Sequence, residues 1–343
     1  MVVRLLAAAV LAVALAAAGA LAAGLDGSWP LPAGLHALVG AGLALALAVT
    51  GLRTAGRDGS GPLPAVLALT PYAVPALLVL LPLALALRVP LAAAVALALL
   101  GIHLAWLAPR FRAEPAPPDA GAVRLRVMVA NVLAGGATAG SVAAAVRAER
   151  PDVLVLVELT PRLAAGLDGT DLRELLPHRS LTPLPHPGGV GIYARRPLAG
   201  DGRLDGTRHA CRQVEVGLDG RQVRIVAVHA HPPRPKLTGC WRGDLETVRT
   251  VAGAQAGPLV VAGDFNATAD HASFRALLDG RLRDAHQARG RGLVRTWPAL
   301  GPLPPLLHLD HVLVSHDLDV LAVHERTIPG SDHRAVVADL ALR

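Results

Sequence analysis

The first third of the chain consists of long apolar runs separated by short polar breaks. The runs are Leu5 to Gly24, Ala33 to Leu52, Leu63 to Leu87 and Val89 to Leu107. Each has about the 20 residues needed to cross the hydrocarbon core of a bilayer. Almost no charge interrupts them, which disfavours the alternative of buried helices in a soluble domain. The pattern predicts a transmembrane region over residues 1–109 with about four helices.

The first run, Leu5 to Gly24, also fits a signal peptide. Small residues at Ala20, Ala22 and Ala23 lie where a cleavage site is expected, although only Arg4 supplies the basic flank. The sequence leaves both interpretations of this run open.

Prolines mark the third run and the segment after the last run. Pro71, Pro75 and Pro82 are expected to kink the third helix, which neighbouring helices tolerate in a membrane. Residues 110–122 are proline-rich and are expected to act as a semi-rigid linker. Residues 123–343 are predicted to form a soluble domain.

In this domain the apolar runs are short, and helical segments separate them. Arg124 to Ala130 begins with the alternation of a half-buried strand, whereas Val153 to Val157 is apolar throughout, as in a strand buried on both faces. Asp219-Gly220 lies between two further runs and predicts a hairpin turn. The other expected strands are 190–196, 211–216, 222–231, 259–264, 312–314 and 335–340, and the expected helices are 141–149 and 241–254. The domain is therefore predicted to be of the α/β class.

Polar side chains capable of chemistry occur at the ends of these strands. They are Asn131, Glu158, His229, Asp264, Asn266, Asp310, Asp332 and His333. A carboxylate at the end of a buried strand is costly unless it is solvated, paired or bound to a metal. The set suits a site that binds a hard divalent cation through oxygen and keeps a histidine near a carboxylate.

Several of these residues also have a purely structural interpretation. Asp264 and Asn266 fit an Asx turn at a strand end, and Glu158 fits a solvated strand end. His229 has a rival in His231, and single histidines are more often structural than catalytic. The recurrence of polar groups at strand ends is what favours a site.

Composition and charge narrow the substrate class. Hydrophobic residues make up 52% of the 343 residues and charged residues 17%, which is unusual for a purely soluble chain. The net charge of +7 comes from scattered arginines with Lys236 as the only lysine, and aromatic residues make up 3%. Few aromatic platforms are therefore present for stacking bases. A small or lipid phosphoester ranks above a nucleic acid as substrate.

The two cysteines, Cys211 and Cys240, are too far apart in sequence for a CxxC motif. They permit one disulfide, which would imply an oxidising compartment. Two free thiols are an equally good alternative.

The order of the polar motifs resembles the endonuclease/exonuclease/phosphatase superfamily of Mg²⁺-dependent phosphoesterases. Asn131 matches the first-strand Asn of that superfamily, Glu158 its metal-binding Glu and His229 its strand-end His. The matching blocks are GDFN at residues 263–266, DH at 310–311 and SDH at 331–333. The resemblance implies a four-layer α/β sandwich, with two packed β-sheets flanked by helices, behind the all-α transmembrane region.

The resemblance also implies roles for the matched residues. Mg²⁺, or Mn²⁺ in its place, would be held by three metal ligands, Glu158, Asn131 and Asp332. The catalytic group would be Asp264, His333, His229, Asp310 and Asn266. Asp264 would orient or deprotonate the attacking water, and His333, held by Asp310, would stabilise charge on the phosphate.

The apolar runs, together with Thr296-Trp297-Pro298 ahead of Asp310-His311, make the chain similar to one membrane-bound actinobacterial subgroup. This subgroup includes the VanJ-type teicoplanin resistance proteins. The similarity implies a membrane-anchored enzyme whose partners are the lipid bilayer and a lipid-linked phosphoester or pyrophosphate of the cell envelope. Val157 departs from the Gln often found before the metal-binding Glu, and the DNA-clamping loops of the nuclease branch are not recognisable. The alternatives are a membrane-tethered nuclease and a non-catalytic domain that binds a lipid or a partner.

Two arguments disagree on the side of the membrane. If all four runs cross, Arg53, Arg57, Arg110 and Arg112 share one side with Arg4, and the positive-inside tendency places the domain in the cytoplasm. The subgroup resemblance and the possible disulfide favour the outside. We expect a multi-pass protein of the cell membrane with an extracytoplasmic catalytic domain.

Overall fold

The computed structural model describes residues 33–115, 123–302 and 304–343. Contacts divide the chain into two units. The first is the N-terminal part up to Pro109 together with Asp270–Ala272, and the second comprises Arg110–Ala269 and Ser273–Arg343. The predicted apolar span Leu5 to Gly24 lies outside the described residues.

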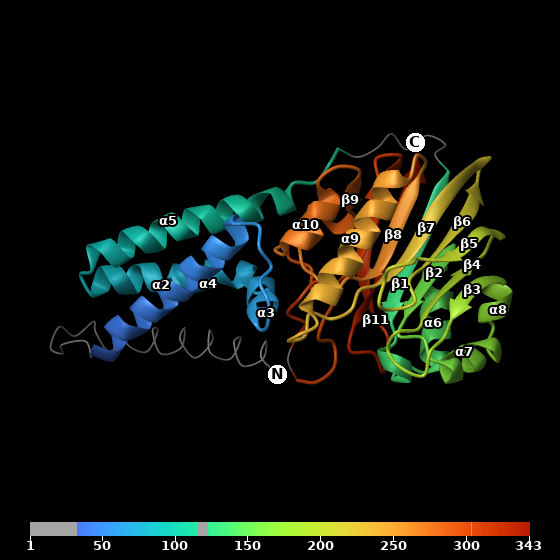
Figure 1. The fold of residues 1–343 in the computed structure, drawn as a ribbon, viewed down its shortest axis with the longest axis horizontal. Coiled ribbons are helices and arrows are strands. Elements are labelled where there is room, and N and C mark those ends of the chain that lie inside the picture. The colour runs from blue at the N-terminus through green and yellow to red at the C-terminus, as the bar shows by residue number, and fades with distance from the viewer. Residues whose placement is uncertain (1–32, 116–122, 303) are drawn as a thin grey trace. The chain divides into compact units, whose positions relative to one another are not determined.

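The N-terminal unit is helical (Figure 1). Its helices are α2 (Ala33–Thr54), α3 (Leu63–Ala68), a 3₁₀ helix at Thr70–Tyr72, α4 (Ala73–Ala86) and α5 (Pro90–Leu107), with a further 3₁₀ turn at Ala108–Phe111. Within the described residues, two helical stretches are long and apolar enough to cross a membrane, Gly34–Thr54 and Pro90–Phe111. A 3.0 Å hydrogen bond between Thr50 Oγ1 of α2 and His103 Nε2 of α5 connects these two helices.

The structure does not form one continuous span from Leu63 to Leu87. The run is divided into α3, the 3₁₀ helix and α4, and its longest apolar helical stretch is Thr70–Ala86. The break lies at Leu69, whose φ of −90° and ψ of 4° are not helical. Thr70 precedes Pro71, and the residue before a proline is disfavoured in the α conformation. Of the three spans predicted within the described residues, two therefore have sufficient length.

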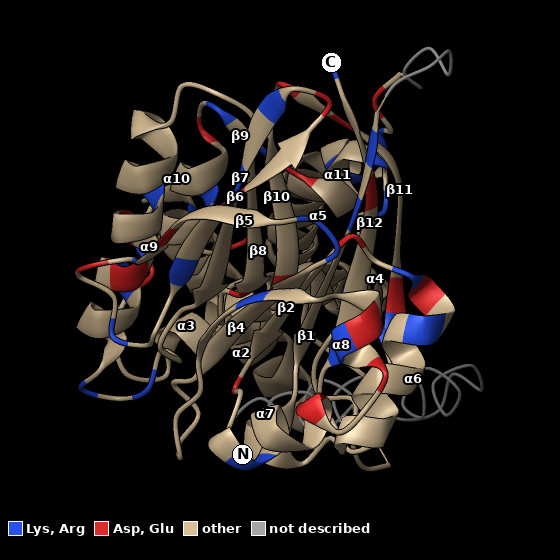
Figure 2. Cartoon of the chain, turned by 90° about the vertical axis from the view of Figure 1, so that its right-hand side faces the viewer, with Lys and Arg blue, Asp and Glu red and all other residues tan. Residues whose placement is uncertain are grey.

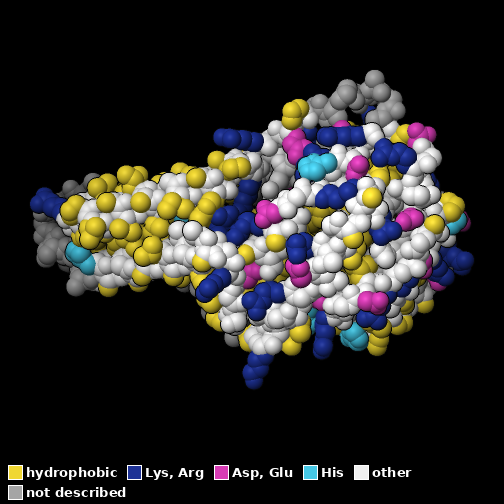
Figure 3. Space-filling model, turned by 45° about the horizontal axis from the view of Figure 1, so that its top comes forward, with side chains coloured by type: hydrophobic (Ala, Val, Ile, Leu, Met, Phe, Trp, Pro, Cys, Tyr) yellow, Lys and Arg dark blue, Asp and Glu magenta, His cyan; other side chains and the backbone are white. Residues whose placement is uncertain are grey.

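Large apolar side chains cover the outer faces of α2, α4 and α5. Leu47 is 57% exposed, Leu85 61% and Leu91 74%. Figure 3 shows hydrophobic side chains gathered over this helical unit. Extensive exposed apolar surface marks a membrane or protein interaction surface.

The second unit contains two packed six-stranded sheets. The first has the order β11-β12-β1-β2-β4-β3 and the second the order β5-β6-β7-β8-β10-β9. The strands are β1 (Arg124–Asn131), β2 (Val153–Val157), β3 (His178–Thr182), β4 (Val190–Ala194), β5 (Leu198–Arg203), β6 (Arg212–Leu218), β7 (Arg221–His229), β8 (Leu259–Asp264), β9 (Leu282–Asp284), β10 (Asp310–Ser315), β11 (Leu318–Thr327) and β12 (Arg334–Leu342). Val127 and Val155 of the first sheet and Ile225 and Val260 of the second belong to the core between the sheets.

Helices cover the outer face of each sheet. On the first sheet lie α6 (Ala139–Glu149), α7 (Pro161–Asp168) and α8 (Leu172–Leu175), and on the second lie α9 (Thr238–Ala254) and α10 (Ala272–Leu278). A 3₁₀ turn, Leu133–Gly135, and a short helix, α11 (Ala285–Ala288), complete the unit. The domain is therefore the predicted four-layer α/β sandwich, with helices, sheet, sheet and helices in succession.

Each sheet has one parallel pair of central strands, and these pairs place the polar residues. β1 pairs with β2 through the α6 crossover, and β7 pairs with β8 through α9. Asn131 aligns with Val157, one residue before Glu158, and His229 aligns with Asp264. Because parallel strands end at the same edge of a sheet, their terminal side chains come together there.

Residues 110–115 of the predicted linker are attached to the second unit. Ala113 forms a β-bridge with Arg289, and the Glu114 backbone N–H donates to the carbonyl of Ala288 at 2.8 Å. This part of the segment is therefore held by backbone pairing rather than acting as a free spacer.

The two cysteines do not form a disulfide. Both Cys211 and Cys240 are free, and Cys211 is buried. The Cys211 sulfur accepts a hydrogen bond from the His229 backbone N–H at 3.3 Å. Burial raises the pKa of the Cys211 thiol to about 11, which keeps it protonated. The disulfide argument for an oxidising compartment is therefore removed.

Candidate active site

Asn131 and Glu158 form one side of the candidate site. The Asn131 amide nitrogen donates to Glu158 Oε1 at 3.0 Å and to Asp264 Oδ2 at 3.1 Å. The Asn131 amide oxygen accepts from the backbone N–H of Leu133 at 2.9 Å. Asn131 thus presents its nitrogen to the site and orients both carboxylates. The amide oxygen keeps a second lone pair, so the role of Asn131 as a metal ligand stays a prediction.

Asp264 lies at the centre of the site, and the GDFN corner shapes its surroundings. The Asn266 backbone N–H donates to Asp264 Oδ1 at 2.8 Å, and the Asn266 side chain donates to the carbonyl of Ala230 at 3.0 Å. The corner is therefore an Asx turn as well as part of the candidate site. A Cβ at Gly263 would lie 1.7 Å from the carbonyl oxygen of Val228, so only glycine allows β7 and β8 to approach this closely.

His333 is held between carboxylates. Its Nδ1 lies 2.8 Å from Asp310 Oδ2, and its Nε2 lies 3.9 Å from Asp264 Oδ2. Asp310 begins β10, which pairs with β8, and Asp310 aligns with Asp264. The Ser331 hydroxyl donates to the Asn131 carbonyl at 2.6 Å and accepts from the His333 backbone N–H at 3.0 Å. The SDH segment is thereby fixed to the end of β1.

Asp332 lies at the edge of the same site. The Trp297 indole donates to Asp332 Oδ2 at 3.1 Å. Asp332 Oδ1 is 3.9 Å from His333 Nε2 and, although buried, has no hydrogen-bond partner among the described residues. The Thr296 hydroxyl accepts from the Asp310 backbone N–H at 3.2 Å. The Thr296-Trp297-Pro298 segment therefore holds both Asp310 of the DH motif and Asp332 of the SDH motif in place.

Of the two candidate histidines, His229 lies in the site and His231 does not. His229 Nε2 lies 3.9 Å from Asp264 Oδ2, whereas the His231 ring contacts its neighbouring Pro232 carbonyl at 2.8 Å. His209 lies against His229 with ring centroids 4.3 Å apart. Burial, followed by the charges of nearby histidines, lowers the pKa of His229 well below its usual value. His229 is thus a neutral imidazole in the site.

Burial and charge pairing set the protonation states of the central groups. Burial raises the pKa of Asp264, while the positive charge of His333 acts in the opposite direction. For His333, burial lowers the pKa, but the Asp310 and Asp264 carboxylates outweigh it and raise the pKa well above its ordinary value. Burial also raises the pKa of Glu158, against the hydrogen bond from Asn131. The arrangement combines a protonated imidazole with a carboxylate that titrates above its normal range.

The donor set fits a hard divalent ion. One ligand atom from each of Asp264, Asp310 and His333 lies within 4.8 Å of the others. A protonated His333 has no lone pair to give, so the available ligands are carboxylate oxygens. Glu158, close enough to feel the charges of His333 and Asp332, and the unpartnered Oδ1 of Asp332 provide such oxygens. Oxygen ligands are what Mg²⁺ prefers.

All eight candidate residues fall into one connected group through the contacts above. Four supporting residues were not assigned a role from the sequence, namely Ser331, Thr296, Trp297 and His209. The first three lie within recognised motifs, so their position was a usable signal. His209 lies in the loop before β6 and has no local pattern that would mark it.

Comparison with known proteins agrees with this geometry. Residues 128–333 match the Endonuclease/Exonuclease/phosphatase family. The chain belongs to this family. Members of the family are generally hydrolases of phosphoesters and typically depend on a divalent metal. Among curated proteins, no sequence matches this chain.

Solved structures show the same family fold. A humanized TDP2 from D. rerio with 14 mutations is 15% identical, with a TM-score of 0.55 over 63% of this chain and 98% of that one. A family protein from Beutenbergia cavernae is 24% identical, with a TM-score of 0.50 over 64% of this chain and 72% of that one. TDP2 from Caenorhabditis elegans is 17% identical, with a TM-score of 0.51 over 64% and 98%. At these identities the similarity concerns the fold alone.

Proposed function

We propose that this chain is a membrane-anchored, Mg²⁺-dependent phosphoesterase that hydrolyses a phosphoester or pyrophosphate of a lipid-linked envelope substrate. The observation that carries the proposal is the contact network among Asn131, Glu158, Asp264 and His333. It places two carboxylates and an imidazole around one point at the edge of two sheets.

In the proposed mechanism Asp264 is the general base. Its raised pKa makes it a better proton acceptor than a solvated aspartate, and Asn131 and Asn266 fix its orientation. Asp264 takes a proton from the attacking water and holds that water in line with the phosphorus. Phosphoryl transfer asks the protein mainly for such positioning and for charge stabilisation.

His333 and His229 stabilise charge on the phosphate. Protonated His333, held by Asp310, donates from Nε2 to a phosphate oxygen as negative charge develops. His229 and Asn266 add neutral contacts. Glu158, Asn131 and Asp332 would hold Mg²⁺, or Mn²⁺ in its place. The bound ion would supply Lewis-acid stabilisation of a phosphate oxygen.

The membrane segment supports a substrate in or near the bilayer. Two described helices have the length and composition of spans, and the outer leucines of this unit are exposed. An enzyme acting on freely diffusing DNA has no need of such an anchor. The similarity to the teicoplanin resistance subgroup suggests a polyprenyl pyrophosphate or a related compound.

We propose an extracytoplasmic catalytic domain. If α2 and α5 are the spans, Arg53 in the last turn of α2 shares one side with Arg57 and Arg88, and Arg4, Arg110 and Arg112 share the other. The positive-inside tendency then gives no preference, and the outward placement rests on the subgroup similarity. A test is labelling of an Asp219→Cys, Cys240→Ser variant from outside intact cells, since Asp219 is exposed. Protection of that cysteine would refute the outward placement.

The activity is tested with the purified full chain on a panel of phosphoesters that includes polyprenyl pyrophosphate and plasmid DNA. We expect phosphate release from the lipid substrate with Mg²⁺, none with EDTA, and none with Asp264→Ala. Equal rates for Asp264→Ala and the wild type would reject the scheme. One matching structure is described as a D. rerio TDP2 complex with single-strand DNA product, so Mg²⁺-dependent cleavage of the plasmid alone would favour a tethered nuclease. Lipid binding that survives Asp264→Ala without turnover would favour a binding domain.

A further inference from the structure

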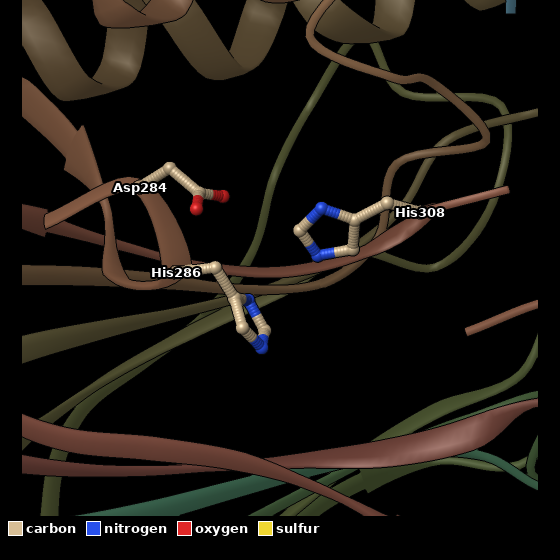
Figure 4. A group of neighbouring side chains, drawn as sticks. All are labelled: Asp284, His286 and His308. Atoms are coloured by element: carbon tan, nitrogen blue, oxygen red, sulfur yellow. The ribbon is translucent and has the colours of Figure 1, made fainter. Parts of the chain in front are cut away.

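A second group of titratable side chains lies outside the proposed catalytic group, between β9, α11 and the loop before β10. Asp284 ends β9, His286 lies in α11, and His308 lies two residues before β10. One ligand atom from each lies within 4.8 Å of the other two. Figure 4 shows the Asp284 carboxyl group and the His308 ring facing each other, with the His286 ring beside them.

We propose that Asp284, His286 and His308 form a second metal site, selective for a borderline first-row ion such as Zn²⁺. Nothing in the proposed phosphoesterase mechanism uses these residues, so the proposal stands apart from that function. We call this group the DHH site.

His286 is oriented as a metal ligand. Its Nε2 lies 3.0 Å from Glu325 Oε1. Because the carboxylate is an acceptor, Nε2 carries the hydrogen and donates a hydrogen bond to it. The other nitrogen, Nδ1, is then left with a lone pair. Although Nδ1 is buried and His286 has no exposed surface, this atom has no hydrogen-bond partner in the described part of the chain. Metal-bound histidines almost always donate their second nitrogen to a carboxylate or carbonyl in this way.

His308 offers a second unused nitrogen. Its Nε2 is buried and has no hydrogen-bond partner among residues that the structure describes. Burial, followed by the charge of His311, lowers the pKa of His308 well below its usual value, while a hydrogen bond with the Asp310 backbone acts in the opposite direction. His308 is therefore a neutral imidazole whose Nε2 lone pair is available. Leaving two such buried nitrogens without partners is unfavourable, and a bound ion would relieve this.

Asp284 is ionised, as a metal ligand must be. His311 Nδ1 lies 2.7 Å from Asp284 Oδ2, and His311 Nε2 lies 3.0 Å from the carbonyl of Ala267. Although burial acts to raise it, the hydrogen bond with His311 lowers the pKa of Asp284 well below its usual value. Asp284 Oδ1 accepts from the Gln287 backbone N–H at 3.0 Å. Each carboxylate oxygen keeps a further lone pair for an ion.

The ligand types select the ion. Two imidazoles and one carboxylate suit Zn²⁺ and its neighbours, whereas Mg²⁺ prefers an all-oxygen set such as Glu158 and Asp332. Bonds of about 2.0–2.2 Å require the three ligand atoms to approach to about 3.3 Å.

A bound ion would connect the loop before β10 to β9 and α11. His308 precedes the candidate catalytic Asp310 by two residues, so the ion would fix the start of β10. The expected role is therefore structural support of the loop that delivers Asp310.

The test is Co²⁺ binding to the chelator-stripped full chain in detergent with saturating Mg²⁺, which occupies the oxygen-rich site. Co²⁺ bound by imidazole and carboxylate gives visible absorption bands, and retained Zn²⁺ is measured by elemental analysis. We expect one ion per chain. His286→Gln and His308→Gln should each weaken binding at least about 10-fold, and Glu325→Gln about 10- to 100-fold.

Two controls identify the site. His316→Gln changes an exposed histidine outside the DHH site and should bind Co²⁺ like the wild type. Asp264→Asn removes a ligand from the alternative cluster and should also bind normally. His308 lies in a loop and is only half-buried, so His308→Gln keeps the test valid if His286→Gln does not fold. No Co²⁺ binding by the wild type, unchanged binding by folded His308→Gln, or lost binding in Asp264→Asn would overturn the proposal.

Discussion

His333 Nδ1 lies 2.8 Å from Asp310 Oδ2, and both side chains are buried where β10 and β12 begin. The pairing holds His333 in its protonated form, although burial alone would favour the neutral ring. Asp310 and His333 are 23 positions apart in sequence. Their contact therefore depends on two separate strands starting at the same edge of the domain.

We expect Asp310→Asn to move the basic limb of the pH profile. Protonated His333 is required for phosphate contact, so kcat/KM falls as pH rises through the pKa of His333. Removing the Asp310 charge lowers that pKa, and the limb should shift to lower pH by about one to three units. The measurement is kcat/KM against pH at saturating Mg²⁺. Asp219→Asn, on an exposed hairpin turn, should leave the limb in place.

The Asp264→Asn variant removes the proposed general base while keeping the side-chain size. We expect kcat to fall about 100- to 10,000-fold. Initial rates of phosphate release measure the effect, and a circular dichroism spectrum checks the fold. Asp279→Asn is the matched control because Asp279 is exposed. A fall of less than threefold in Asp264→Asn would assign the base to another group.

The wild-type acid limb reports on Asp264. Because burial raises its pKa, the deprotonated base forms only well above the pH near 4 expected for a solvated aspartate. The rate should therefore rise with pH on the acid side of neutrality. Replacing Mg²⁺ with Mn²⁺ distinguishes this limb from metal loss, since a limb set by Asp264 persists with either ion at saturation. An acid limb at pH 4 would contradict the role of burial.

Gly263→Ala should prevent correct folding. The added Cβ would lie 1.7 Å from the Val228 carbonyl oxygen, so β7 and β8 would have to separate at the site. Gly253→Ala is the control, because its Cβ meets nothing within 4 Å and it lies in α9. We expect Gly253→Ala to stabilise the protein by up to about 1 kcal/mol. The two variants are compared by thermal unfolding and by the yield of soluble protein in detergent micelles. Equal stability would show that β7 and β8 can separate without loss of the fold.

Many elements of the domain could be predicted because patterns of a few neighbouring residues determine them. The apolar run Val153–Val157 is exactly as long as β2, and Asp219-Gly220 forms the hairpin between β6 and β7 with both residues at positive φ. Strands with mixed polar and apolar residues were missed, such as β3 and β5, because they lie at sheet edges where burial is incomplete. Edge strands lack the clear alternation on which sequence patterns depend.

The candidate active site was predictable as a set of residues but not as a geometry. GDFN, DH and SDH named the participants, while the direction of the Asn131 amide depends on the Leu133 backbone N–H that engages its oxygen. The DHH site had no sequence signal, because Asp284 ends β9 whereas His308 lies in the loop before β10. Their separation in sequence does not match a known ligand spacing.

The amino-acid sequence by itself determined the apolar N-terminal runs, the buried strands and the polar residues at strand ends, because hydrophobic periodicity and turn chemistry act over a few neighbouring residues. Only the tertiary structure decided which side chains meet. It left both cysteines as free thiols, and it brought the buried side chains of Asp264 and His333 to 3.9 Å from each other. These outcomes depend on strand order, register and burial, which arise from contacts between distant segments.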